Sequence, residues 1–347
     1  MVRKAAACIF ILLILSGNAL FADVISEPAA TVNLIRSKVI SVESLNEKVQ
    51  VYQEQIAKEG SLEKINPLDV LNVMINDELV LQGAERDGFT ISEAQVDQLV
   101  KQQKAYVEQQ VKTSITDAQF EQVLLNNYGM DLSAFRKNLK ESALVDLYVR
   151  GTQADVLQNF SEPTEIEIME FYRANRSAFI NPELVRISHI FMPFTEADKD
   201  SVKAEMDKLA RWLRYNTYTF EELVPKYSKD TASINKGGDI GWLAFDDTSM
   251  RGYLGDAFFN AVFELPLGKT SGVLESTGGF HIVKATTHID PKMLAIDDVI
   301  NPESTVTVRQ YIQQNLLSRN QQAAYLLGIN MLVESLRKSA LIDILYK

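Results

Sequence analysis

Cysteine and histidine are scarce in this sequence, and their scarcity limits the chemistry that the chain can perform. The 347 residues include one cysteine, Cys8, and three histidines. Because Cys8 lies in an N-terminal apolar segment, the rest of the chain has neither a thiol nucleophile nor a disulfide. The sequence also lacks a G-x-S-x-G motif, a phosphate-binding loop and a zinc-binding helix motif. No carboxylate lies at metal-ligand spacing from the histidines of the predicted strands, so we expect no metal ion and no cofactor.

The N-terminal apolar run is too short to span a bilayer comfortably, and it has the layout of a secretory signal peptide. In residues 1–22, two basic residues precede an apolar stretch at residues 5–15, and small residues follow. Cleavage after Ala19 and cleavage after Ala22 both fit this pattern. The alternative is an N-terminal anchor that is not removed. We expect an exported, periplasmic protein that is soluble once the signal has been cleaved.

Acidic residues outnumber basic ones, with 46 Asp and Glu against 35 Lys and Arg and a net charge of −11. Loss of residues 1–22 would make this balance more negative, because they contain two basic residues and no acidic one. An acidic protein is repelled by polyanions, so we expect no nucleic-acid partner. The length predicts two or three domains. The composition, 46% hydrophobic and 23% charged, is that of a globular protein.

Helix signals dominate residues 23–181. Asn66 followed by Pro67 predicts a helix start, and apolar residues then recur at helical spacing until Gly88. A stretch rich in β-branched residues, 31–41, predicts a strand before these helices. Capping boxes, in which Ser or Thr precedes Gln or Glu by three positions, predict further helix starts at Ser92, Thr116, Thr164 and Thr219.

The pattern changes over residues 182–288. Residues 183–194 alternate as a strand does, with His189 on the same face as apolar residues. Helices, a glycine-rich stretch and a final strand at residues 278–288 follow, and this last strand contains His281. The order β-α-α-β-α-β predicts a compact α+β domain.

The remainder, residues 289–347, is predicted to form a polar linker, a long C-terminal helix at about residues 305–338, and a last strand in "ALIDILYK". If this strand pairs with the strand at residues 31–41, both ends of the chain build the helical domain. The α+β domain is then an insertion in it.

Three polar residues are candidates for a functional site. His189 and His281 are either an imidazole pair at that site or core histidines with satisfied hydrogen bonds. His288 falls at a strand end and is predicted to be a surface residue. Asp230 lies in "YSKDTASINKGGDIGW", residues 227–242, and is either a functional carboxylate or a turn residue. The adjacent glycines of this stretch permit positive φ and a tight reversal of the chain.

Three segments, "ISHIF", "YSKDTASINKGGDIGW" and "GGFHIVK", occur in the order and spacing of a parvulin-type peptidyl-prolyl isomerase domain, which residues 182–288 resemble. The whole chain resembles the SurA/PrsA group of exported folding factors, and "NVMINDELVLQGAERDGFTISEAQVDQ" is similar to a helix pair of that group. The resemblance implies a mostly helical N-terminal chaperone domain, residues 23–181, completed by the C-terminal helix. The inserted domain would be parvulin-like.

The resemblance also implies roles for six residues. It assigns catalysis to His189, Asp230 and His281, and binding of the proline ring to Ile240, Leu254 and Phe258. The stretch before the pocket helix is longer than expected, so Met250 and Tyr253 are alternatives to Leu254. Asp230 would act either as a protonated donor to the substrate carbonyl or as an ionised group that disfavours the planar amide.

The implied function is cis–trans isomerisation of X–Pro bonds together with chaperone activity. The implied partners are unfolded or nascent exported polypeptides, and the group suggests outer-membrane protein precursors among them. Phosphate recognition is not expected, because residues 192–200 contain one base among acidic and apolar residues. Two alternatives stay open. One is a non-catalytic chaperone whose parvulin domain only binds peptides, and the other is an exported scaffold or adhesin-like protein.

Overall fold

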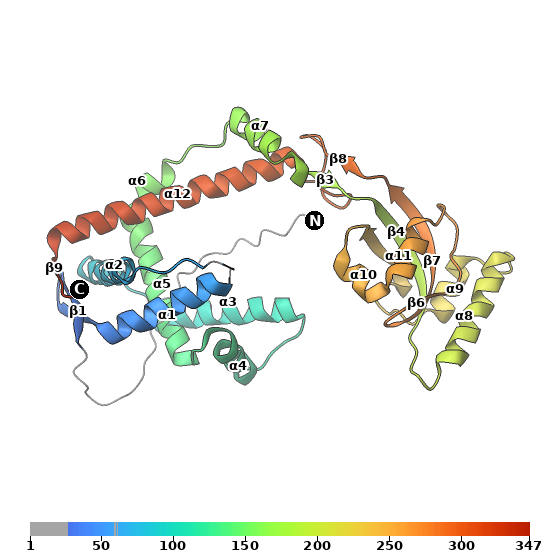
Figure 1. Cartoon of the computed structure of the whole chain (residues 1–347), viewed down its shortest axis with the longest axis horizontal. Helices are drawn as coiled ribbons and strands as arrows, with labels where there is room; N and C mark the ends of the chain where they lie inside the picture. Colours follow the sequence, from blue (N-terminus) through green and yellow to red (C-terminus); the bar gives the residue numbers. More distant parts are fainter. Residues whose placement is uncertain (1–26, 59, 61) are drawn as a thin grey trace. The chain divides into compact units, whose positions relative to one another are not determined.

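The computed structural model describes residues 27–58, 60 and 62–347, and these form two compact units (Figure 1). The terminal unit comprises residues 27–162 and Leu317–Lys347, and the central unit comprises Pro163–Leu316. The predicted signal peptide lies outside the described residues. Within the described ranges, no helix combines the length and the apolar character needed to cross a membrane.

The terminal unit contains helices and one small antiparallel sheet. The sheet has the order β2-β1-β9, and its strands are β1 (Pro28–Asn33), β2 (Ser37–Ser41) and β9 (Leu341–Ile344). The helices are α1 (Val42–Lys58), α2 (Pro67–Arg86), α3 (Glu93–Val111), α4 (Asp117–Tyr128), α5 (Leu132–Thr152) and α6 (Ala154–Gln158). The predicted pairing of the last strand with the first is confirmed, since β9 pairs with β1.

Local capping explains where several helices begin. Asn66 caps α2 by accepting the N–H of Leu68, and Pro67 occupies the first helical position as predicted. The four predicted capping boxes are all present, at the starts of α3, α4, α7 (Glu165–Ala174) and α9 (Phe220–Tyr227). These contacts span three residues, so the sequence alone is enough to predict them.

The prediction of one strand over residues 31–41 is wrong, because the chain turns at residues 34–36 and forms a hairpin. The side-chain oxygen of Gln82, a fully buried residue of α2, accepts the N–H groups of Leu34 at 3.0 Å, Ile35 at 3.1 Å and Arg36 at 3.4 Å. These donors have no partner in the strands. A buried amide from a distant helix therefore stabilises a turn that no local signal announces.

Two cores stabilise the terminal unit. The larger one joins β1, α1, α2 and α5 to the second half of α12 (Val308–Ser339), which contributes Leu332, Val333 and Leu336. The smaller one joins α4 and α5 through Phe120, Leu124, Met130, Phe135 and Leu139. The apolar stripes of these helices are thus at least partly core, as helical spacing usually indicates.

The central unit contains a four-stranded antiparallel sheet with the order β5-β4-β7-β6. Its strands are β4 (Leu184–Met192), β5 (Asp239–Ala244), β6 (Leu274–Ser276) and β7 (Gly279–Ile289). Helices α8 (Lys199–Arg214) and α9 pack on one face, and α10 (Thr248–Leu254) and α11 (Asp256–Phe263) pack on the other (Figure 1). The predicted α+β class is confirmed, although α10 and β6 were not predicted.

The prediction of a polar linker after residue 288 needs correction. Strand β8 (Lys292–Met293) pairs with β3 (Ile180–Asn181), which follows the short 3-10 helix Arg176–Ala178. Leu294 is 6% exposed and shares a core with residues of α7 and the start of α12. The charged residues of this segment suggested a solvated linker. Met293 and Val299 are indeed exposed, but Leu294 is buried, and Ile296 and Ile300 pack against the same core, so that these three residues fix the segment to the central unit.

Candidate active site

Strands β4 and β7 place two histidines on one face of the central sheet. His189 lies opposite Val283, and Phe191 lies opposite His281, so the histidines are diagonal neighbours across the two strands. Their Nδ1 atoms are 3.2 Å apart. The ring of Phe191 stacks on His189, with centroids 5.7 Å apart, and lies 4.8 Å from His281. The alternation predicted from the sequence therefore brings both imidazoles together.

The glycine-rich loop brings Asp230 to the first histidine. Asp230 follows α9, and its Oδ2 lies 3.0 Å from Nε2 of His189. The loop is held against β4 by the N–H of His189, which donates to the carbonyl of Gly238 at 2.8 Å. Gly238 has φ +80°, and a Cβ there would lie 2.4 Å from the carbonyl oxygen of His189. The glycine is thus required both by the backbone conformation and by this close approach.

Two serines extend this arrangement, and the sequence analysis missed both. Ser276 Oγ lies 2.8 Å from Nε2 of His281, and the hydroxyl of Ser233 donates to Oδ2 of Asp230. The only sequence signal for Ser233 is that serine and aspartate are both common turn residues. Ser276 had none, because its contact depends on how β6 turns into β7.

Burial and hydrogen bonding set the charges of the three polar groups. Burial lowers the pKa of His281 to about 3, and the charge of His189 acts in the same direction. Burial also lowers the pKa of His189, against the opposing effect of Asp230. For Asp230, burial raises the pKa, but hydrogen bonds from Ser233, His189 and the amide of Ala232 outweigh it and leave the pKa below its ordinary value. At neutral pH the imidazoles are therefore neutral and the carboxylate is ionised.

These charges fix the direction of the hydrogen bonds. An ionised Asp230 only accepts, so Nε2–H of His189 donates to it and Nδ1 of His189 is left unprotonated. That nitrogen accepts from Nδ1–H of His281, whose Nε2 then accepts the hydroxyl hydrogen of Ser276. The 2.8 Å distance from Ser276 to His281 is shorter than its 3.3 Å distance to the carbonyl of Gly279, which agrees with this assignment. The four side chains form one chain of donors directed toward Asp230.

The three predicted pocket residues lie near this chain but differ in exposure. Phe258 is 1% exposed, and its ring meets that of His281 edge-on, with centroids 5.1 Å apart. Leu254 is 3% exposed in the same core. Ile240 is half-buried, packs against that core and faces a hollow. Of the three, only Ile240 is both next to the polar chain and open to a ligand in this structure.

Two alternatives to Leu254, and the third histidine, can also be placed. Met250 is half-buried against the same core as Leu254, whereas Tyr253 is 53% exposed. His288 was predicted to be a surface residue, but it is half-buried, and its Nε2 lies 2.7 Å from Oε1 of Glu183. It takes no part in the chain of donors.

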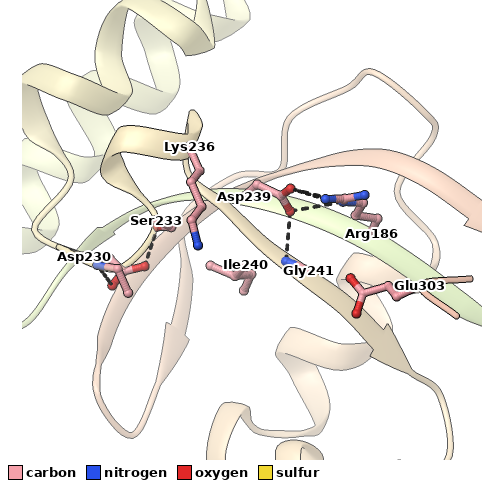
Figure 2. Close-up of a pocket in the computed structure, with 9 residues that line it drawn as sticks. Arg186, Asp230, Ser233, Lys236, Asp239, Ile240, Gly241 and Glu303 are labelled. Atoms are coloured by element: carbon pink, nitrogen blue, oxygen red, sulfur yellow. Dashed lines mark hydrogen bonds and ion pairs between the residues drawn. The ribbon is translucent and has the colours of Figure 1, made fainter.

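A hollow of about 390 Å³ opens beside Asp230 (Figure 2). Across it, Nη2 of Arg186 lies 2.6 Å from Oδ2 of Asp239, and Oδ1 of Asp239 accepts the N–H of Gly241 at 2.9 Å. The lining residues are Arg186, Asp230, Ala232, Ser233, Lys236, Asp239, Ile240, Gly241 and Glu303. The hollow thus joins two of the predicted site residues to a set of charged side chains.

Comparison with known families accounts for most of the chain. Residues 172–288 match the family described as a PPIC-type PPIASE domain, and residues 2–148 match a SurA-like N-terminal domain. The chain is 26% identical to the chaperone SurA of Nitrosococcus oceani over 261 residues, which cover 73% of this chain and 57% of that protein. It is 29% identical to the foldase protein PrsA of Bacillus subtilis over 163 residues, 47% of this chain and 45% of that one.

Solved structures align with the chain at low similarity. A chain from the structures of two SurA-like chaperones of Campylobacter jejuni aligns with 93% of this chain and 100% of its own length, with 13% identity and a TM-score of 0.38. The chain spans a little over half the length of the first curated relatives, 57%, 55% and 55%. The chain therefore matches a SurA-like N-terminal domain followed by a PPIC-type PPIase domain, and it is similar to SurA and PrsA proteins.

Proposed function

We propose that the central unit is an active peptidyl-prolyl cis–trans isomerase whose domain covers residues 182–288. The observation that carries this proposal is the continuous chain of hydrogen bonds from Ser276 through both histidines to an ionised carboxylate. If these were only core histidines whose hydrogen bonds are satisfied, no carboxylate at the edge of a hollow would be needed. The proposed catalytic residues are His189, Asp230 and His281, and the proposed residues for the proline ring are Ile240, Leu254 and Phe258.

The reaction makes modest chemical demands on such a site. Rotation about an X–Pro bond is slow because amide conjugation must be broken, at a barrier of about 18–20 kcal/mol. No covalent bond to the protein is needed. The twisted amide is less polar than the planar one, so an apolar wall that excludes water stabilises the twisted state relative to the ground state. Ile240 would supply this wall directly, and Phe258 and Leu254 would support it from the core.

The lowered pKa of Asp230 favours one of its two possible roles. An ionised carboxylate cannot donate to the substrate carbonyl. Its charge disfavours the planar amide, in which negative charge builds up on the carbonyl oxygen, and thereby favours the twisted amide. The neutral histidines would hold this carboxylate in place without neutralising its charge.

The terminal unit would act as a chaperone for unfolded, exported polypeptides, including outer-membrane protein precursors. The relatives named chaperone SurA support this proposal, and so do the exposed apolar side chains of α12, Leu326, Leu327 and Met331. The domain expected over residues 23–181, with the C-terminal helix and strand within residues 289–347, would end at residue 162, because residues 163–181 belong to the central unit. The layout of residues 1–22 supports export to the periplasm.

The test is isomerisation of a short proline peptide by the purified protein, compared with Asp230→Ala. We expect the variant to fold and to lose activity, whereas Asp200→Ala, on the exposed first turn of α8, should remain active. Suppression of aggregation of a denatured protein should be unchanged in both variants. A folded wild-type protein that suppresses aggregation but does not isomerise would instead establish the non-catalytic chaperone.

A further inference from the structure

We propose that the hollow beside Asp230 is a subsite for an acidic side chain adjacent to the X–Pro bond, and that Lys236 selects it. This inference rests on the proposed function, because it names the peptides that the isomerase would prefer. The hollow begins at Asp230 and Ile240, where the proline would be held, so residues next to the proline are the ones that reach the rest of it.

Two of the charged side chains in the hollow compensate each other. The guanidinium of Arg186 forms two-pronged contacts with Asp239, at 2.6 and 3.1 Å from Oδ2. Asp230 accepts from a histidine, a hydroxyl and a backbone amide, which hold it in place but are neutral and leave it its negative charge. Within the described part of the chain, the ammonium of Lys236 forms no ion pair or hydrogen bond, and it acts only at a distance, by lowering the pKa of Asp239. Lys236 therefore supplies the uncompensated positive charge of the hollow.

The position of Lys236 suits a contact with a bound peptide. It ends the 3-10 helix Ile234–Lys236, directly before the adjacent glycines that turn the loop into β5. Figure 2 shows its side chain extending over the hollow toward Ile240. A carboxylate carried by the residue next to the proline would meet this ammonium while the proline itself rests against Ile240.

Glu303 gives the hollow an opposite charge. It lies in the segment that follows the region matched to the PPIC-type domain, residues 172–288, and its carboxylate contributes to the raised pKa of Arg186. A negative charge at this rim repels an acidic peptide, whereas Lys236 attracts it. Removing each charge should therefore change the affinity for the same acidic peptide in opposite directions. The affinity for the neutral peptide should not change in either case.

Residues 192–200, where phosphate recognition is not expected, do not supply this preference. Lys199, the one base of residues 192–200, is held by Glu275 at 2.7 Å and stacks over Phe194. The preference would come instead from the loop that carries Asp230, and it would be for a carboxylate.

The test measures binding of fluorescent peptides, blocked at both ends, that differ only in Glu, Gln or Lys on either side of the proline. Of the two Glu peptides, with Glu before or after the proline, we expect one to bind the wild-type protein about two- to fivefold more tightly than its Gln counterpart. This is the range for an exposed ion pair. In Lys236→Gln the Glu and Gln peptides should bind equally well, and in Glu303→Gln the preference for the Glu peptide should increase. In Lys236→Glu the Lys peptide should bind more tightly than the Glu peptide. Lys229→Gln, an exposed lysine of the same loop that does not line the hollow, is the matched control.

The inference is overturned if Glu and Gln peptides bind equally, if Lys229→Gln changes the ratio as much as Lys236→Gln, or if the folded protein binds none of the peptides. Isomerisation of the Gln peptide, measured in parallel, reports on the proposed function separately. A protein that isomerises without preferring Glu refutes the subsite alone, whereas one that prefers Glu in binding without isomerising refutes the catalytic proposal alone.

Discussion

Replacing Asp230 by asparagine is the sharpest test of the proposed site. Asparagine has the same shape and still accepts a hydrogen bond, but it has no charge and can donate through its amide group. A protonated aspartate would donate in a similar way. The substitution therefore separates the two roles considered for Asp230, because asparagine can replace the protonated acid but cannot replace the ionised one.

The structure sets the size of the expected effect. The hydrogen bond from Nε2 of His189 to Asp230, 3.0 Å long, involves a charged acceptor, and such bonds contribute about 1.5–3 kcal/mol. If this energy is expressed in the transition state, the loss corresponds to a decrease in kcat/KM of about ten- to a hundredfold. The unfolding midpoint should fall by no more than about 2–4 °C, because asparagine retains part of the hydrogen bonding.

The assay is cis–trans isomerisation of a proline peptide at pH 7.5, with circular dichroism to verify the fold. Asp200→Asn, an exposed substitution of the same kind in the central unit, serves as the control and should behave as the wild type. Activity within twofold of the wild type in Asp230→Asn would refute the argument that an ionised carboxylate drives the reaction. Equal losses in both variants would show that the effect is not specific to the site.

Three further predictions concern stability. Gly237→Ala should lower the unfolding free energy of the central unit by about 1–2 kcal/mol, because residue 237 has a positive φ. Gly238→Ala should lower it further, because a Cβ there would also meet the carbonyl of His189. Equal unfolding midpoints of the two variants would contradict this. The pKa of His281 is about 3 in the folded protein and lies below that of the unfolded chain. Its contribution to stability is therefore complete above about pH 6.5 and is lost at about 1.4 kcal/mol per pH unit as the pH falls. In denaturant titrations from pH 7 to 4, the unfolding free energy of His281→Asn should fall less steeply with decreasing pH than that of the wild type, and an equal dependence on pH would refute the shift. Gln82→Leu should destabilise the terminal unit by about 2–4 kcal/mol, since it leaves backbone N–H groups unpaired. Gln102→Leu, the same substitution at an exposed position of α3, should cost much less, and similar thermal unfolding of the two variants would contradict this.

The candidate site could be predicted in part. Strand alternation placed His189 and His281 on inward faces, and the resemblance to parvulins added Asp230; the structure brings all three together. Neither signal identified Ser276, which completes the chain of donors from a turn between two strands. Nor did they predict that Phe258 would be almost fully buried, because exposure depends on how neighbouring helices pack over it.

The sequence by itself determined the elements whose contacts are local: the helix starts, which depend on side chains three residues apart, and the two strands β4 and β7, which alternate clearly. Tertiary structure decided the features that join distant positions. Gln82 turns the hairpin 46 residues before it, and Leu294 anchors a segment whose composition suggested a linker. In both cases a buried group finds its partner far along the chain, and the partner is set by packing and not by the residues that flank it.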